Sequence, residues 1–226
     1  MNAKKWFAAG VGVAAGSYAA LVASAWLRYG DAPSARGDEV DELLDRFMPV
    51  YDVVERHHIG VSAPADVTFA AATEVDPNQS TIVRAIFRGR ELAMGSRHVR
   101  PPQEHGFVRQ MRAIGWGVLA EVPGREIVMG AVTKPWLAEV VFRPLPPDEF
   151  AAFQEPGFAK IVWTLRADPL GDGKSVFRTE TRVVPTDRFA RAKFRRYWSF
   201  VSPGIILIRW MLLRPVKAEA ERRFNG

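Results

Sequence analysis

The chain has 226 residues, of which 48% are hydrophobic and 25% charged, a composition typical of a folded domain with one substantial core. Because it contains no cysteine, disulfides, zinc sites with thiolate ligands and cysteine nucleophiles are excluded. The net charge is +6, and residues 187–226 alone carry ten basic and three acidic side chains, which favours either contact with an anionic surface or a solvated helix face.

Residues 1–28 are predicted to form a single N-terminal membrane anchor. The uncharged stretch 6–27 would reach about 33 Å as a helix, enough to cross a hydrocarbon layer of about 30 Å. A cleaved signal peptide is the alternative, because Ala23-Ser24-Ala25 has the small-x-small pattern of a cleavage site, and the domain would then be exported. Basic residues on the two sides nearly balance, so the side of the membrane stays open.

Residues 29–49 are predicted to form a linker with one short helix, and residues 50–226 the folded domain. The linker begins with glycine, proline and serine, and helical spacing of acidic and leucine residues follows at 38–47. The β-branched stretch 51–61 favours a strand, and Pro64 then suits the start of a helix.

The middle of the domain is predicted to contain a second helix and then antiparallel strands. Residues 80–92 place apolar side chains on one helical side. Around Pro123-Gly124 the apolar pattern changes to period two, which predicts a hairpin. Two clearer strands, 159–167 and 175–184, flank a turn sequence. Three charged residues of the later strand fall on the face that we expect to be wetter: Arg178, Glu180 and Arg182.

The C-terminal region is predicted to be helical. Thr186 and Asp187 suit a helix cap, and Ser202-Pro203 suits the start of a second helical segment. The centre of that segment, 205–213, is apolar apart from Arg209. Because it is too short to span a bilayer, we expect it to pack on the sheet or to lie in an interface.

The order of these elements resembles the helix-grip fold of the START/Bet v 1-like superfamily. Four motifs are similar to those of bacterial SRPBCC proteins of the polyketide cyclase/dehydrase and lipid-transport type: SAPADV (62–67), PGFAK (156–160), TETRV (179–183) and FRRYW (194–198). The resemblance implies an α+β domain in which a curved antiparallel sheet of about six to seven strands wraps around a long C-terminal helix, with a cavity between them. Members carry lipids, bind hormones, cyclise polyketides or act as scaffolds, so the fold leaves the activity open.

Large side chains at inward positions are candidates for lining such a cavity, with a histidine as its polar group. The same side chains would otherwise fill an ordinary core. The candidates are His58, Trp116, Met129, Trp163, Phe177 and Trp198.

The histidines give no metal site. His57 and His58 are adjacent in a predicted strand, so their side chains point to opposite faces. His98 and His105 flank a proline-containing segment that forms either a rim over the cavity or a surface loop. No G-x-S-x-G, P-loop or H-E-x-x-H motif occurs, so no cofactor, metal or catalytic residue is assigned.

Basic residues interleaved with aromatic ones open the C-terminal helix. Such a pattern favours nucleic acid or anionic lipid headgroups, and beside a membrane anchor we prefer the headgroups. The residues expected at the membrane surface are Arg188, Arg191, Lys193, Arg195 and Arg196.

The sequence therefore predicts a membrane-tethered domain that binds a hydrophobic small molecule or lipid between its sheet and C-terminal helix. One alternative is an enzyme of the polyketide cyclase/dehydratase type, with a histidine or acid in the cavity as the general base. The other is a non-catalytic scaffold with a filled core. Neither the ligand nor the oligomeric state is specified.

Overall fold

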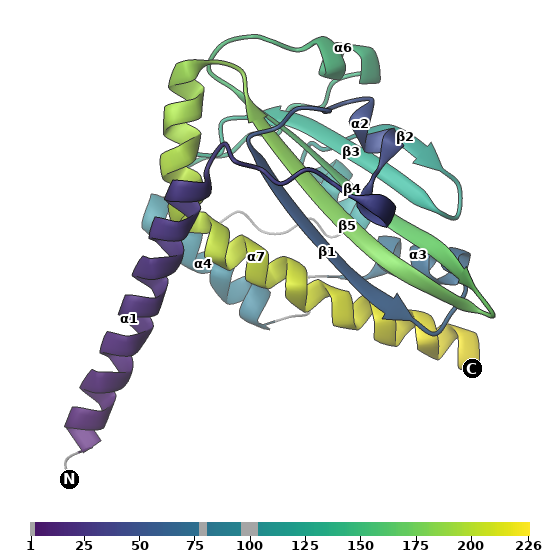
Figure 1. The fold of residues 1–226 in the computed structure, drawn as a ribbon, viewed down its shortest axis with the longest axis horizontal. Helices are drawn as coiled ribbons and strands as arrows, with labels where there is room; N and C mark the ends of the chain where they lie inside the picture. Colours follow the sequence, from purple (N-terminus) through teal and green to yellow (C-terminus); the bar gives the residue numbers. More distant parts are fainter. Residues whose placement is uncertain (1–2, 77–80, 96–103) are drawn as a thin grey trace.

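The computed structural model describes residues 3–76, 81–95 and 104–226 (Figure 1). Its elements in chain order are α1 (Ala3–Arg28), η1 (Gly37–Glu39), α2 (Glu42–Asp45), β1 (Val53–Val61), α3 (Ala65–Glu74), α4 (Thr81–Met94), α5 (Phe107–Ala113), β2 (Gly117–Val122), β3 (Glu126–Thr133), α6 (Pro147–Ala152), β4 (Ala159–Gly171), β5 (Lys174–Pro185) and α7 (Arg188–Asn225). The helix expected at 38–47 is divided into two short turns, because the Asp41 carboxylate caps a new turn by accepting the Leu44 N–H at 2.8 Å.

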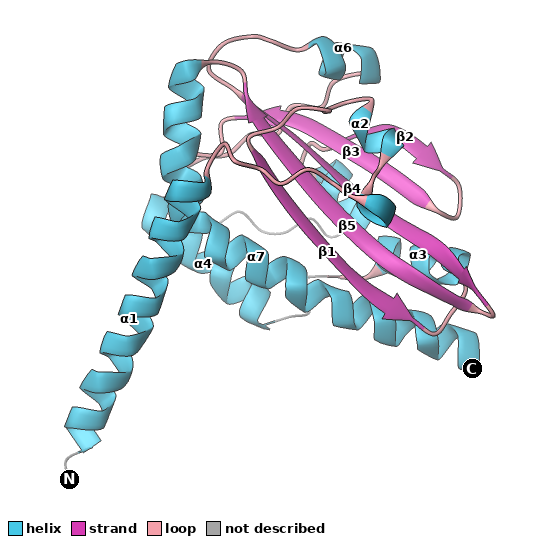
Figure 2. Ribbon diagram, viewed as in Figure 1, coloured by secondary structure: helices cyan, strands magenta, loops and turns pink. Residues whose placement is uncertain are grey.

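Five strands form one antiparallel sheet in the order β1-β5-β4-β3-β2 (Figure 2). The expectation of six to seven strands is therefore wrong. After β3 the chain carries four prolines between positions 135 and 147, and it meets the sheet through the isolated bridge of Val132 with Arg143. Because proline donates no hydrogen bond to a strand ladder, this segment does not add a strand.

Helices α7 and α3 pack on one face of the sheet, which we call the inner face (Figure 2). The largest buried cluster lies between them and the sheet, and it joins Met129, Trp163 and Phe177 to Leu213 and Val216 of α7. A sheet packed around a long C-terminal helix is the arrangement that the helix-grip resemblance implied. The α+β class is confirmed.

The C-terminal region is one helix and not two. Asp187 caps α7 as expected, because its carboxylate accepts the N–H groups of Phe189 and Ala190 at 2.6 and 3.0 Å. Pro203 lies inside the helix instead of starting a new one. Since proline lacks an N–H and crowds the preceding turn, it bends a helix. Figure 1 shows a first part of α7 beside α1 and a longer second part across the inner face.

The outer face of the sheet is covered by residues 37–48, which we call the strap. Leu44 and Met48 of the strap are buried against strand residues such as Val162. Arg182 and Glu180, expected on a wetter face, are only 1% and 6% exposed beneath it. The alternation of side chains along β5 is as predicted. The expectation that its charged face is exposed to water is wrong, because the strap covers that face.

The second half of α1 packs against the first part of α7. The Tyr18 hydroxyl donates to the Phe200 carbonyl at 2.5 Å, and the Arg195 guanidinium donates to the Trp26 carbonyl at 2.9 Å. Among the described residues, one helix is long and apolar enough to cross a bilayer by length and composition alone; it is α7, and the core helix of a soluble protein passes the same test. The anchor at 1–28 and the boundaries of the linker therefore stay predictions.

Candidate functional site

Two polar side chains of β1 and two of β5 lie on the inner face. In the register of the sheet Glu55 is opposite Thr181, and His57 is opposite Thr179. Alternation along β1 puts Glu55 and His57 on the same face as the buried Val61, toward α7. The Nε2 atom of His57 lies 3.7 Å from a carboxylate oxygen of Glu55.

Helix α7 adds a charged side chain to this region. Arg209 precedes Leu213 by four positions and Val216 by seven, so it shares the helix face that these buried residues turn toward the sheet. Its charge acts electrostatically on both Glu55 and His57. We call Glu55, His57, Thr181 and Arg209 the interior polar cluster.

Three atoms of the interior polar cluster are buried without a hydrogen-bond partner among the described residues: Nε2 of His57, Oγ1 of Thr181 and Nε of Arg209. A buried polar atom without a partner costs about 1–3 kcal/mol, so such atoms are rare and call for a partner, either a water molecule or a ligand. Their proximity identifies the candidate site.

Burial sets the protonation of the cluster. It raises the pKa of Glu55, an effect that the Arg209 charge partly offsets. It also lowers the pKa of His57, and the charges of Arg209 and His58 lower it further, so His57 is neutral at neutral pH. Burial lowers the pKa of Arg209 to about 10, which still leaves the guanidinium charged.

His58, the histidine expected to line the cavity, lies on the outer face and is exposed. The strand alternation that separates the two histidines turns His57 inward. Of the other histidines, His105 is exposed, and His98 with its neighbouring prolines lies outside the described residues.

The other residues expected to line the cavity are all buried, but they do not form one group. Trp116, Met129, Trp163 and Phe177 belong to the inner-face cluster, where the rings of Trp116 and Trp163 are 5.8 Å apart. Trp163 is opposite Thr181 in the sheet and so borders the interior polar cluster. Trp198 lies in a separate cluster with Phe194.

The five basic residues expected at a membrane surface differ in their contacts. Arg188, Arg191, Lys193 and Arg196 are exposed. Arg191 forms an ion pair with Asp52. Arg195 is partly buried and lies 4.2 Å from the centre of the Trp26 ring.

Two hollows lie outside the inner face. One on the outer face, lined by Arg56, Arg166 and Glu180 among others, has a volume of about 20 Å³, the size of one water molecule. The other is an open apolar groove of about 670 Å³ between α1 and α7, lined by residues that include Trp26 and Phe200.

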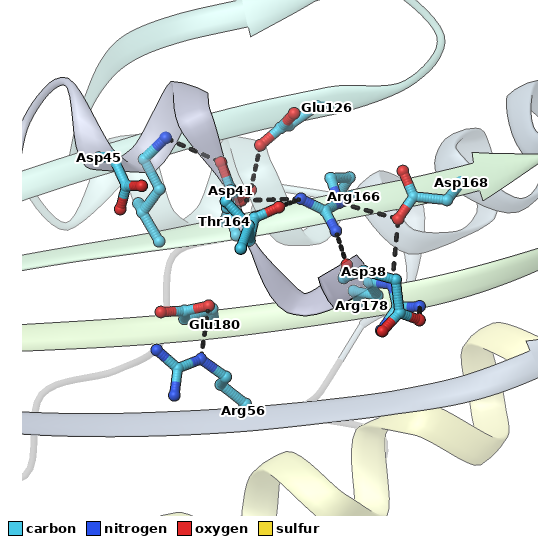
Figure 3. A network of polar contacts seen from close by, with 12 residues as sticks. Asp38, Asp41, Asp45, Arg56, Glu126, Thr164, Arg166, Asp168, Arg178 and Glu180 are labelled. Carbon is cyan, nitrogen blue, oxygen red and sulfur yellow. Dashed lines mark hydrogen bonds and ion pairs between the residues drawn. The ribbon is translucent and has the colours of Figure 1, made fainter. Parts of the chain in front are cut away.

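The polar residues of the outer face form a network that holds the strap (Figure 3). Arg166 donates to the carbonyls of Val40 and Asp38 at 2.9 and 2.8 Å, and it pairs with Asp168 at 2.9 Å. Arg178 joins the network through Asp168 at 3.0 Å. Because its contacts tie the strap to β4 and β5, we assign the network to stability.

Glu126, at the edge of this network, should make stability fall as pH rises. Burial and the neighbouring Asp41 raise its pKa from 4.5 to about 8. Between these two values the folded chain holds the more protons, so the free energy of unfolding should decrease by up to about 1.4 kcal/mol per pH unit. Urea unfolding across pH 4–9 measures this slope. Glu126→Gln should remove it, and Glu121→Gln, an exposed control on β2, should not. An unchanged slope in Glu126→Gln would contradict the assignment.

Sequence reasoning missed Arg209 and chose the other histidine. A signal for each was present: Arg209 interrupts an apolar run on the helix face of Leu213 and Val216, and His57 shares its parity with Ile59 and Val61.

Comparisons with known proteins show only weak similarity to solved structures. No family model matches the chain, and no curated protein matches it. The model is similar to a conserved protein from Geobacillus kaustophilus (12% identity, 75% of this chain and 96% of that chain, TM-score 0.35). It is also similar to the Zhui aromatase/cyclase from Streptomyces sp. R1128 (15%, 76% and 94%, 0.26) and to norcoclaurine synthase from Thalictrum flavum (14%, 86% and 98%, 0.33). With TM-scores below 0.5, these likenesses carry no argument about activity.

Proposed function

We propose that this protein binds a hydrophobic small molecule or lipid between the inner face of its sheet and α7, while α1 tethers it to a membrane. The interior polar cluster carries the proposal. Its three unpaired polar atoms lie in a region otherwise formed by apolar residues such as Trp163 and Leu213. An amphiphile matches both parts, because its polar end would pair with these atoms and its chain would gain about 0.8 kcal/mol per buried methylene.

Exposed apolar side chains support the tether. Leu21 and Leu27 of α1 are 54% and 77% exposed, and Phe200 and Trp210 of α7 are 54% and 52% exposed. The exposed Arg196 lines the apolar groove between α1 and α7. Apolar contact together with cationic side chains is the combination that suits an anionic bilayer surface.

Extraction of the purified full chain tests the proposal. We expect one amphiphile, close to one molecule per chain, in the solvent extract analysed by mass spectrometry. Thr181→Phe, which adds bulk inside the cluster, should reduce this amount at least about tenfold, because overpacking would displace the ligand. Lys174→Phe adds the same ring at an exposed position of β5 and should leave the amount unchanged. Equal extracts from the unmodified chain and Thr181→Phe would instead favour the scaffold with a filled core.

A further inference from the structure

We infer that the ligand of the interior polar cluster carries a carboxylate, with Arg209 as its binding partner, so that the natural class of ligand is a long-chain carboxylic acid. This inference rests on the proposed function and specifies the polar end of its ligand. It follows from the donors, the charges and the surroundings of the cluster.

The unpaired atoms of the cluster are suited to donate hydrogen bonds. Nε of Arg209 can only donate, the Thr181 hydroxyl can donate, and Nε2 of neutral His57 donates when its proton lies there. A carboxylate accepts through two oxygens with about four lone-pair positions, whereas a ligand hydroxyl offers two and needs an acceptor for its own proton. The set of three donors therefore matches a carboxylate better than an alcohol.

The charges also favour an anion with one negative charge. Arg209 is partly buried and supplies one positive charge, and the described residues place no carboxylate within the 4 Å of an ion pair with it. Glu55 is the acidic group whose charge acts on Arg209, and burial raises the pKa of Glu55. A ligand carboxylate would form the charge-assisted contact that the protein leaves open.

The surroundings call for a long apolar chain. Trp163, directly opposite Thr181, and Leu213, one turn from Arg209, are 4% and 5% exposed. Polar groups of a ligand would lose their water beside these side chains without gaining hydrogen-bond partners, whereas an alkyl chain has no such groups.

Photolabelling compares two probes of equal length, a diazirine derivative of hexadecanoic acid and the matching derivative of hexadecanol. The full chain is placed in phosphatidylcholine nanodiscs, illuminated and digested, and labelled inner-face peptides are counted by mass spectrometry. Because a hydrogen bond to a charged group is stronger than a neutral one, we expect the acid to label them at least about tenfold more than the alcohol. Arg209→Gln should bring the ratio close to one. Arg214→Gln, an exposed arginine five positions further along α7, should keep the ratio.

The outcomes separate the two proposals. Equal labelling by both probes in the unmodified chain would overturn the carboxylate and leave the proposed function standing. No inner-face labelling by either probe would overturn both. If Arg209→Gln loses labelling by both probes, competition in the unmodified chain decides: unlabelled hexadecanoate must displace the acid probe at least about tenfold better than hexadecanol does, and equal displacement would overturn the inference.

Discussion

Replacing Arg182 by methionine should lower the free energy of unfolding by about 3 kcal/mol, the lower end of the range for a broken buried ion pair. Arg182 is 1% exposed, pairs with Glu180 at 2.7 Å and with Asp45, and donates to the Met48 carbonyl at 2.8 Å. Methionine keeps most of the side-chain volume but leaves these acceptors without their donor. Arg56, which pairs with Glu180 at 3.0 Å, limits the loss.

Chemical unfolding of Arg182→Met beside Arg125→Met measures this effect. Arg125 is more than half exposed and pairs with Asp168 at 3.4 Å, so its replacement should cost less than about 1 kcal/mol. Proteolysis within the strap should also become faster in Arg182→Met, since Asp45 and Met48 belong to the strap. If both variants lost similar amounts of unfolding free energy, the burial of Arg182 would not increase its contribution to stability.

Gly115→Ala should destabilise the fold by about 4 kcal/mol, because strain and collision add at this position. The backbone of Gly115 has φ +104°, which L-residues rarely adopt, and a Cβ there would overlap the Phe142 carbonyl oxygen. The neighbouring Trp116 stacks on Phe142 with ring centres 4.9 Å apart, so a shift of Phe142 would disturb the inner-face core.

Gly124→Ala separates the two causes. Gly124 also has a positive φ, +71°, but the nearest atom to its Cβ position is the Asp66 Cβ at 3.8 Å. It should therefore cost only the conformational strain, about 1–2 kcal/mol. Thermal unfolding of both variants gives the comparison, and equal losses would remove the collision from the explanation.

The local parts of the fold could be predicted because local patterns determine them. Period-two alternation identified β4 and β5 and assigned Trp163 and Thr181 to one face. The cap at Asp187 follows from its side chain and position. The strap could not be predicted in the same way, since Arg182 and Asp45 are 137 positions apart and no local pattern links them.

The candidate site likewise could be predicted only where local sequence patterns determine it. Alternation separates His57 from His58, but only the side on which α7 packs decides which of them is enclosed. The approach of Arg209 to Glu55 depends on the register between α7 and β1, and that register is a tertiary contact. Pro203 predicts the start of a new helical segment, but proline also fits inside a bent helix, and packing on the sheet favours a continuous α7.

Hydrogen bonds join the residues directly after α1 to the residue that precedes β1. Directly after α1, the Gly30 N–H donates to the Asp52 carbonyl at 3.1 Å, and the Tyr29 hydroxyl donates to the Asp52 carboxylate at 3.3 Å. Together with the contacts of Tyr18 and Trp26 with α7, these bonds hold α1 in a defined orientation relative to the sheet. Whatever surface holds α1 thus also sets the tilt of the sheet and the height of Arg209 above that surface.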